Sequence, residues 1–213
     1  MIVDARTVGP FSEKSYLVVD DATKRAALID PGDEPDELID MVRRSGAALE
    51  AIWLTHGHLD HIGGIAGVLR QFAVPVHMHA ADLPLYLRAS EQAAMYGVPF
   101  EQPEPPDAEL ADGAVLTLGS LSFEVTHLPG HSPGHVVLRS GDIVFGGDLL
   151  FAGSIGRTDL PLGDPVRMQE SLMRICELSD DTVIHPGHGP RTTIGRERAA
   201  NGFLTGAARI ARR

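Results

Sequence analysis

Residues 53–61 read Trp-Leu-Thr-His-Gly-His-Leu-Asp-His, a THxHxDH stretch that packs four potential metal ligands into six residues: His56, His58, Asp60 and His61. Imidazole nitrogens and carboxylate oxygens suit zinc, iron and other divalent transition ions. The preceding apolar run, 51–54, predicts a buried strand with the ligands at its C-terminal end. Because side chains alternate along an extended chain, the first two histidines share one side. Asp60 and His61 follow the turn, so the spacing indicates room for two metal ions.

Three further candidate ligands follow short β-rich runs in the second half of the chain. His131 comes after residues 123–126, Asp148 after 143–145 and His188 after 182–184. Each lies among Gly or Pro residues that make tight turns. A catalytic metal site needs ligands from separate parts of the chain and one position left for water. We therefore expect these strand ends to converge on one rim.

The ordered set of seven ligands resembles that of metallo-β-lactamase-fold hydrolases, in their compact glyoxalase II-like (hydroxyacylglutathione hydrolase-like) branch. The resemblance covers nearly the whole chain and includes the flanking segments 28–32, 153–159 and 187–190. It implies an α/β fold, a four-layer αββα sandwich, as a single domain over residues 1–213. It also implies one metal held by His56, His58 and His131, a second held by Asp60, His61 and His188, and Asp148 bridging the two.

Apolar periodicity predicts the main helices. One is expected over 35–46, stopped by Gly46, and one runs on from the ligand motif through Ile62, Ile65, Leu69 and Phe72. A third begins with Asp164 as N-cap and Pro165 as its first residue. Short strands are expected at 2–4, 15–20 and 26–29 in addition to those that precede the ligands.

Residues 80–112 contain five prolines and interrupt the regular succession of predicted strands. A helix is expected over 83–96, followed by a loop. We expect the apolar residues of this segment to cover a satellite core; these are Leu85, Met95, Tyr96 and Phe100. The alternative is that the segment shapes the substrate pocket, because loops beside a rigid rim often do so.

Several polar residues near the ligands are candidates for a supporting role. His135 and His185 lie beside ligand turns, so we expect both to form hydrogen bonds behind the metal ligands and orient them. Asp30 either shapes its Pro-Gly turn or does the same. His77 and His127 are expected to be structural, as lone histidines usually are.

Composition and charge limit the function classes. With 213 residues, 43% of them hydrophobic, the chain is long enough for a sizeable core. No apolar stretch approaches the ~20 residues of a membrane span, and the N-terminus lacks the apolar centre of a signal peptide. Cys176 is the only cysteine, so no intramolecular disulfide can form. This fits a reducing compartment, and we expect a cytoplasmic protein.

The net charge of −11 argues against a nucleic-acid partner. An anionic substrate would need a local cation, for which Arg157 and Arg191 are the candidates. The resemblance implies that Arg157 occupies the position where glyoxalase II enzymes bind glutathione; a structural pair with Asp159 or Asp164 is the alternative. Asp159 and Pro190 depart from the family pattern, since the long glyoxalase II enzymes have tyrosines there. The oligomeric state stays open.

These residues predict a metal-dependent thioester hydrolase acting on an S-2-hydroxyacyl conjugate of glutathione or another low-molecular-weight thiol. Metal ions lower the pKa of bound water from ~15.7 towards ~7, which supplies hydroxide, and Asp60 could orient it as the catalytic carboxylate. A thiol, with a pKa of ~8.5, leaves readily as thiolate. Two zinc ions are expected, with iron, manganese or single occupancy as alternatives.

Three other functions remain open at this stage. One is a mononuclear iron persulfide dioxygenase, which would use His56, His131 and Asp148. Another is a β-lactam or other ester or amide hydrolase on the same fold. The third is a non-catalytic binding module, against which the intact ligand set argues.

Overall fold

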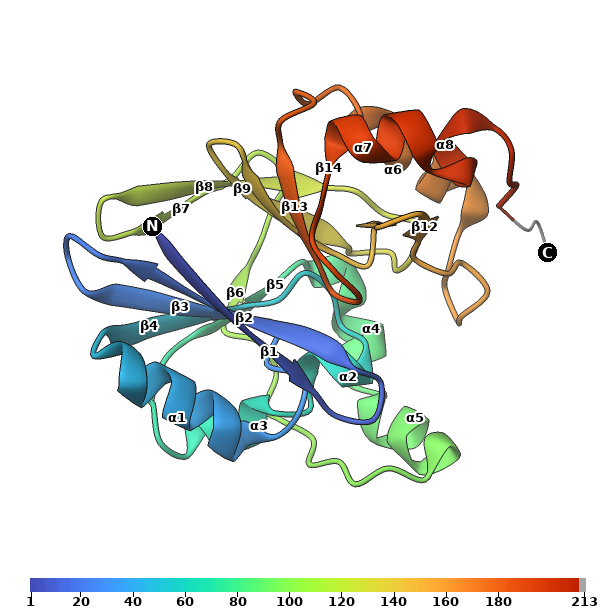
Figure 1. Ribbon diagram of the computed structural model, residues 1–213. Helices are drawn as coiled ribbons and strands as arrows, with labels where there is room; N and C mark the ends of the chain where they lie inside the picture. Colours follow the sequence, from blue (N-terminus) through green and yellow to red (C-terminus); the bar gives the residue numbers. More distant parts are fainter. Residues whose placement is uncertain (211–213) are drawn as a thin grey trace.

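The computed structural model, which describes residues 1–210, consists of two β-sheets packed face to face with helices on both outer faces (Figure 1). In spatial order, the first sheet contains β1 (Ile2–Val8), β2 (Glu13–Asp20), β3 (Arg25–Ile29), β4 (Ala48–Trp53), β5 (Val76–Met78) and β6 (Ala108–Glu109). The second contains β14 (Thr192–Thr193), β13 (Val183–Pro186), β10 (Ile143–Gly147), β9 (Val136–Ser140), β8 (Leu121–His127) and β7 (Val115–Leu118). A small hairpin, β11 (Leu150–Phe151) with β12 (Ser154–Ile155), follows β10. The predicted four-layer αββα sandwich is confirmed.

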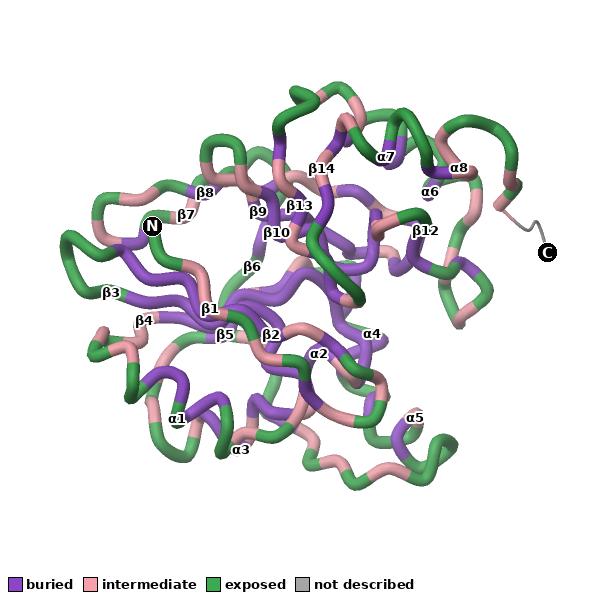
Figure 2. The backbone as a smooth tube through the Cα atoms, viewed as in Figure 1, coloured by how far each residue is buried: buried purple, intermediate pink, exposed green. Residues whose placement is uncertain are grey.

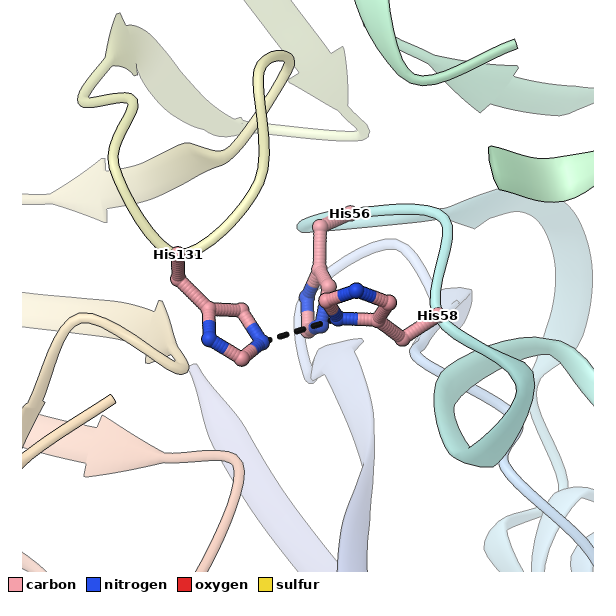
Figure 3. Close-up of side chains that lie close together, drawn as sticks. All are labelled: His56, His58 and His131. Atoms are coloured by element: carbon pink, nitrogen blue, oxygen red, sulfur yellow. Dashed lines mark hydrogen bonds between the residues drawn. The ribbon is translucent and has the colours of Figure 1, made fainter. Parts of the chain in front are cut away.

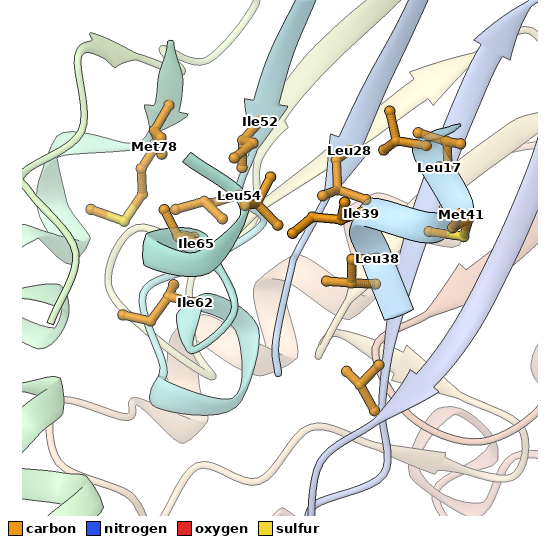
Figure 4. Close-up of a cluster of buried hydrophobic side chains, with 14 of the residues drawn as sticks. Leu17, Leu28, Leu38, Ile39, Met41, Ile52, Leu54, Ile62, Ile65 and Met78 are labelled. Atoms are coloured by element: carbon orange, nitrogen blue, oxygen red, sulfur yellow. The ribbon is translucent and has the colours of Figure 1, made fainter. Parts of the chain in front are cut away.

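Three groups of buried apolar side chains hold the four layers together. The first lies between the first sheet and helices α1 (Pro35–Ser45), α2 (Leu59–Ile62) and α3 (Ile65–Leu69) (Figure 4). The second fills the space between the sheets, where Trp53 packs edge-on against Phe123. The third lies between the second sheet and α6 (Pro165–Ile175) and α7 (Ile194–Ala200), which α8 (Gly202–Thr205) follows. The central strands β2, β3 and β10 are therefore almost wholly buried, whereas the edge strands β1 and β6 are more exposed (Figure 2).

The ends of two predicted helices are confirmed. Helix α1 ends at Ser45, and Gly46 follows in the left-handed conformation that favours glycine. Helix α6 begins at Pro165, and the Asp164 carboxylate accepts hydrogen bonds from the backbone N–H groups of Val166 and Arg167. Local sequence signals determine both boundaries.

The expectation of one continuous helix after the ligand motif is wrong, because α2 and α3 are separated at Gly63 and Gly64. Here the chain packs against the loop that follows β3, and the Gly64 N–H donates to the Pro31 carbonyl at 2.8 Å. A Cβ atom on Gly63 would lie 2.5 Å from the Gly32 carbonyl oxygen. The break thus comes from a close backbone approach between segments about 30 residues apart.

The expected helix over 83–96 is also two helices, α4 (Leu83–Tyr86) and α5 (Ala89–Tyr96). The Gln102 side chain separates them. Its amide nitrogen donates to the Tyr86 carbonyl at 2.9 Å, and its amide oxygen accepts from the Ser90 N–H at 3.2 Å. In a continuous helix the Ser90 N–H would donate to the Tyr86 carbonyl. The inserted Gln102 amide therefore replaces one backbone hydrogen bond of the helix. A short 3₁₀ helix, η1 (Ala80–Asp82), precedes α4.

Within residues 1–210, every helix is too short or too polar to cross a membrane.

Candidate metal centre

All seven predicted ligands come together at one end of the two sheets. His56 and His58 lie on the loop after β4, and Asp60 and His61 on α2. The other three follow β8, β10 and β13 and are His131, Asp148 and His188. Ligand atoms lie within 4.8 Å of one another in each of three groups, which are His56, His58 and His131; Asp60, His61 and His188; and His56, His61 and Asp148. The first two groups, here called the first and second trios, are the two sets that the resemblance implied.

The first trio consists of three imidazoles facing one another (Figure 3). His58 Nδ1 and His131 Nε2 are 2.9 Å apart, and the His131 Nδ1 donates to the Arg157 carbonyl at 2.8 Å. Burial lowers the pKa of His58 to about 3 and also holds the pKa of His56 well below its usual value. The rings of His56 and His58 are therefore neutral at pH 7, which is the form that binds metal ions.

The carboxylate of Asp148 lies between the two trios. Its Oδ2 is 3.5 Å from His131 Nε2 and 3.5 Å from His188 Nε2, and its Oδ1 is 3.5 Å from His61 Nε2. Burial opposes ionisation of Asp148, but the His61 charge acts together with hydrogen bonds from His188 and His61, and these contacts hold the pKa of this carboxyl well below its usual value. An ionised carboxylate in this position can touch an ion in either trio.

The second trio is more open to solvent. His188 Nε2 lies 3.4 Å from Asp60 Oδ2, and about a quarter of the His188 side chain is exposed. Although burial acts against protonation, the Asp148 and Asp60 carboxylates raise the pKa of His188 to about 9. The two trios therefore differ in electrostatic character, since histidines surround the first and carboxylates flank the second.

Asp30 lies behind His61. Its carboxylate accepts the Thr55 N–H at 2.7 Å and the Thr55 hydroxyl at 2.6 Å, and its Oδ2 is 3.0 Å from His61 Nδ1. This contact directs the other ring nitrogen of His61 toward Asp148. The geometry is that of a group that orients a metal ligand, rather than one that only shapes a turn.

The two histidines expected behind the ligands have different surroundings. His135 Nε2 accepts a hydrogen bond from the Asp148 N–H at 3.0 Å and so supports the backbone of that residue. The His185 ring instead packs against the rings of Tyr16 and Phe145, each centroid 5.3 Å away. The structure thus brings His135 to the ligand set but places His185 in an aromatic cluster, because its strand presents it to the first sheet.

Glu13 and Asp82 also lie close to the ligands, although no sequence motif marks either residue. Glu13 is 1% exposed, accepts the Ser15 hydroxyl at 3.0 Å and lies 3.8 Å from His61 Nδ1. Burial raises the pKa of this carboxyl well above its usual value. Neither residue stands in a recognisable motif; only the fold brings them near the ligands.

The donor set fits metal ions. His56 Nε2, His61 Nε2 and Asp148 Oδ1 are buried, and within residues 1–210 they have no hydrogen-bond partner. Buried polar atoms are seldom left in this state, because each loses its hydration without compensation. Neutral imidazoles and carboxylates in two trios with a shared carboxylate are a ligand set for two divalent transition ions.

A pocket of about 410 Å³ opens above the ligands, and His58, Asp60, His131, Asp148 and His188 all line it. Most of its wall is apolar and comes from Phe11, Leu59, Leu85, Met95, Tyr96, Phe151, Ile155, Leu160 and Pro161. Met95 and Tyr96 of α5 are 86% and 53% exposed. The expectation that they only cover a satellite core is therefore wrong, whereas Phe100 does pack against the first core. Residues 80–112 thus supply one wall of the pocket.

Arg157 lines the same pocket, and its side chain is 58% exposed. Its Nε and Nη2 atoms each lie 2.7 Å from an oxygen of Asp159, so the structural pair left open by the sequence is present. Arg191 is not part of the described pocket wall. A guanidinium at the rim of an apolar pocket remains able to contact an anionic group of a substrate.

Comparison with known proteins agrees with this geometry. Residues 8–188 match the family model of the metallo-β-lactamase superfamily. The chain is 38% identical to the hydroxyacylglutathione hydrolase GloC of Haemophilus influenzae, covering 96% of this chain and 98% of that protein. Among solved structures, TTHA1623 in a di-iron-bound form is 44% identical with a TM-score of 0.88, covering 94% of this chain and 100% of that one. The B3 metallo-β-lactamase BLEG-1 is 36% identical with a TM-score of 0.89, covering 96% and 100%. The sequence, the fold and the ligand set agree that this chain belongs to the metallo-β-lactamase superfamily.

Proposed function

We propose that this protein is a metal-dependent hydrolase that cleaves a small-molecule thioester, an S-2-hydroxyacyl conjugate of glutathione or another low-molecular-weight thiol. The observation that carries the proposal is the meeting of two ligand trios around Asp148 at the base of an apolar pocket. The similarity to the hydroxyacylglutathione hydrolase of Haemophilus influenzae supports the substrate class. The single cysteine supports a cytoplasmic location. The net negative charge supports a protein without a nucleic-acid partner, and we expect no membrane partner.

One divalent ion would be held by the first trio, His56, His58 and His131. The other would be held by the second trio, Asp60, His61 and His188, and Asp148 would contact both ions. Such ions lower the pKa of water and polarise a carbonyl oxygen. We expect zinc; the di-iron form of TTHA1623 supports iron as the alternative.

The residues around the ligands have separate roles in this reaction. Asp60 lines the pocket. Burial opposes its ionisation, but the hydrogen bond from His188 and the charges of His61 and His58 together keep the pKa of the Asp60 carboxyl below its usual value. As a carboxylate, Asp60 can accept a proton or hydrogen bond from the attacking water and orient it. A thiolate leaves without a general acid, since the pKa of a thiol is ~8.5.

The direct test is an assay of S-lactoylglutathione hydrolysis, paired with metal analysis of protein purified without added metal. Thioester cleavage that scales with metal content is the expected result. Oxygen consumption with glutathione persulfide, in the absence of thioester cleavage, would instead establish the dioxygenase alternative.

The similarity to BLEG-1 makes β-lactam hydrolysis the second candidate function. Nitrocefin turnover by the same preparation tests it. We expect nitrocefin cleavage to be far slower than thioester cleavage, because an amide leaving group needs a proton, and a thiolate does not. Nitrocefin turnover without thioester cleavage would contradict the thioester assignment.

Replacing Arg157 with alanine should raise the KM for S-lactoylglutathione about tenfold and leave kcat nearly unchanged, because uniform ground-state binding is lost. Steady-state kinetics measure the effect. Arg191→Ala is the matched control, since it removes the same charge from outside the described pocket wall and should leave KM unchanged. An unchanged KM for the Arg157 variant would limit this residue to its pair with Asp159.

A further inference from the structure

We propose that Asp82 is a positioning residue that sets the separation of the two loops carrying the first trio. This inference rests on the proposed metal site and assigns a role to a residue that binds no metal itself. Asp82 ends η1 (Ala80–Asp82), directly before α4, and its exposure is 0%. A buried carboxylate needs several donors to offset its lost hydration, so its partners show what it holds in place.

Three hydrogen bonds join the Asp82 carboxylate to both ligand loops. Its Oδ2 accepts from the Gly57 N–H at 2.9 Å and from the Ser132 hydroxyl at 2.7 Å. Its Oδ1 accepts from the Gly134 N–H. Gly57 lies between the ligands His56 and His58, and Ser132 directly follows the ligand His131. One carboxylate therefore bridges the two segments that supply the first trio, which are more than 70 residues apart in sequence.

The two glycines permit this close contact. A Cβ atom on Gly134 would lie 2.7 Å from the Asp82 backbone nitrogen, and one on Gly57 would lie 3.1 Å from the Asp82 carbonyl oxygen. Any larger residue at position 134 would push η1 away from the loop. The backbone of η1 is thus inserted between the ligand loops, and its side chain binds both.

The described hydrogen bonds of the Asp82 side chain involve only the first trio. The second trio has a support that does not involve Asp82, because the Asp30 carboxylate lies 3.0 Å from His61 Nδ1. This division matters because His58 Nδ1 and His131 Nε2 are only 2.9 Å apart. These two nitrogens share a hydrogen bond, and once a cation takes the place of the shared proton their lone pairs repel each other, so the loops need a fixed spacing. Asp82 provides that spacing for the first trio alone.

The test is the metal affinity of Asp82→Asn, measured by chelator competition with Zn²⁺. The amide offers one acceptor oxygen in place of two, so in either orientation at least one donor loses its partner. We expect one of two bound ions to bind about 10- to 100-fold more weakly, with the other unchanged. Binding of both ions as in the wild-type protein would overturn the proposal.

Asp20→Asn is the matched control, because Asp20 is equally buried and accepts the Ser120 N–H at 2.6 Å and the Thr23 hydroxyl at 2.6 Å. Asp20 is the last residue of β2, whereas Glu13, the first residue of that strand, forms a β-bridge with the ligand His188. Asp20 therefore lies at the end of β2 that is away from the metal site. This variant should lower the unfolding temperature without changing metal affinity. An equal loss of affinity in both variants would show that Asp82 acts only through general stability.

Ser132→Ala decides the question if the Asp82 variant does not fold, since it removes one donor and keeps both backbone hydrogen bonds. A smaller weakening of the same single ion supports the proposal; unchanged affinity contradicts it. Wild-type protein that binds no Zn²⁺ would contradict the proposed function itself, whereas wild-type binding with an unaffected Asp82→Asn variant contradicts only the role of Asp82.

Discussion

Replacing His58 with alanine should reduce kcat/KM for the thioester by more than about a hundredfold, with the fold retained. Residues that only support a metal ligand typically change activity by about 10- to 100-fold, so loss of a ligand itself should exceed that range. His58 is 5% exposed, lies 2.9 Å from His131 and lines the floor of the pocket. It belongs to none of the three apolar cores, so its truncation leaves their packing intact.

His77→Ala is the matched control for this variant. His77 lies on β5 and is not among the residues of the described ligand groups. Kinetics, metal content and far-ultraviolet circular dichroism should separate the two variants: both keep the wild-type spectrum, and only His58→Ala loses activity and bound metal. Wild-type turnover by His58→Ala would reject the metal-site assignment.

Removing the metal ions should abolish turnover and lower the unfolding temperature. A ligand that binds only the folded state stabilises it by about 4 kcal/mol when its free concentration is 1,000 times its Kd. For a chain of this length, that corresponds to a shift of roughly 8 to 16 °C. The physical reason is that His56 Nε2, His61 Nε2 and Asp148 Oδ1 are buried and lack hydrogen-bond partners within residues 1–210.

The measurement is a thermal melt and a thioester assay before and after exhaustive dialysis against a chelator. Chelator already saturated with metal serves as the control and should change neither quantity. Adding back Zn²⁺, Fe²⁺ or Mn²⁺ separately then identifies the ion that restores activity. Full turnover by protein shown to be metal-free would exclude a metal-dependent mechanism.

The fold class followed from the family resemblance, whereas local patterns were sufficient for several element boundaries. Gly46 marks the end of α1, and Asp164 with Pro165 marks the start of α6, because caps act on the residues next to them. The candidate ligands could also be named from sequence, since His and Asp at strand ends among glycines form a dense local signal. Their grouping into trios came from resemblance, because spacing alone does not say which ligands meet.

The breaks between helices could not be predicted, because each depends on a distant partner. Gly63 and Gly64 meet the loop after β3, and the Gln102 amide takes the place of a helical hydrogen bond between Tyr86 and Ser90. Hydrophobic periodicity predicts which face of a helix is apolar, but it does not predict where a distant segment interrupts the helix. The same limit explains why Met95 and Tyr96 were expected in a core and instead line the pocket.

The sequence by itself determined several helix ends and the chemical types that gather at the strand ends, because capping residues and the His and Asp motif act over a few neighbouring positions, and it gave the architecture through its resemblance to a known family. Only the tertiary structure decided which groups support those ligands. It placed Asp30 and Glu13 beside His61, set Asp82 between two ligand loops and turned His185 toward Tyr16 and Phe145. Such contacts join residues far apart in the chain, and they exist only after the sheets have packed.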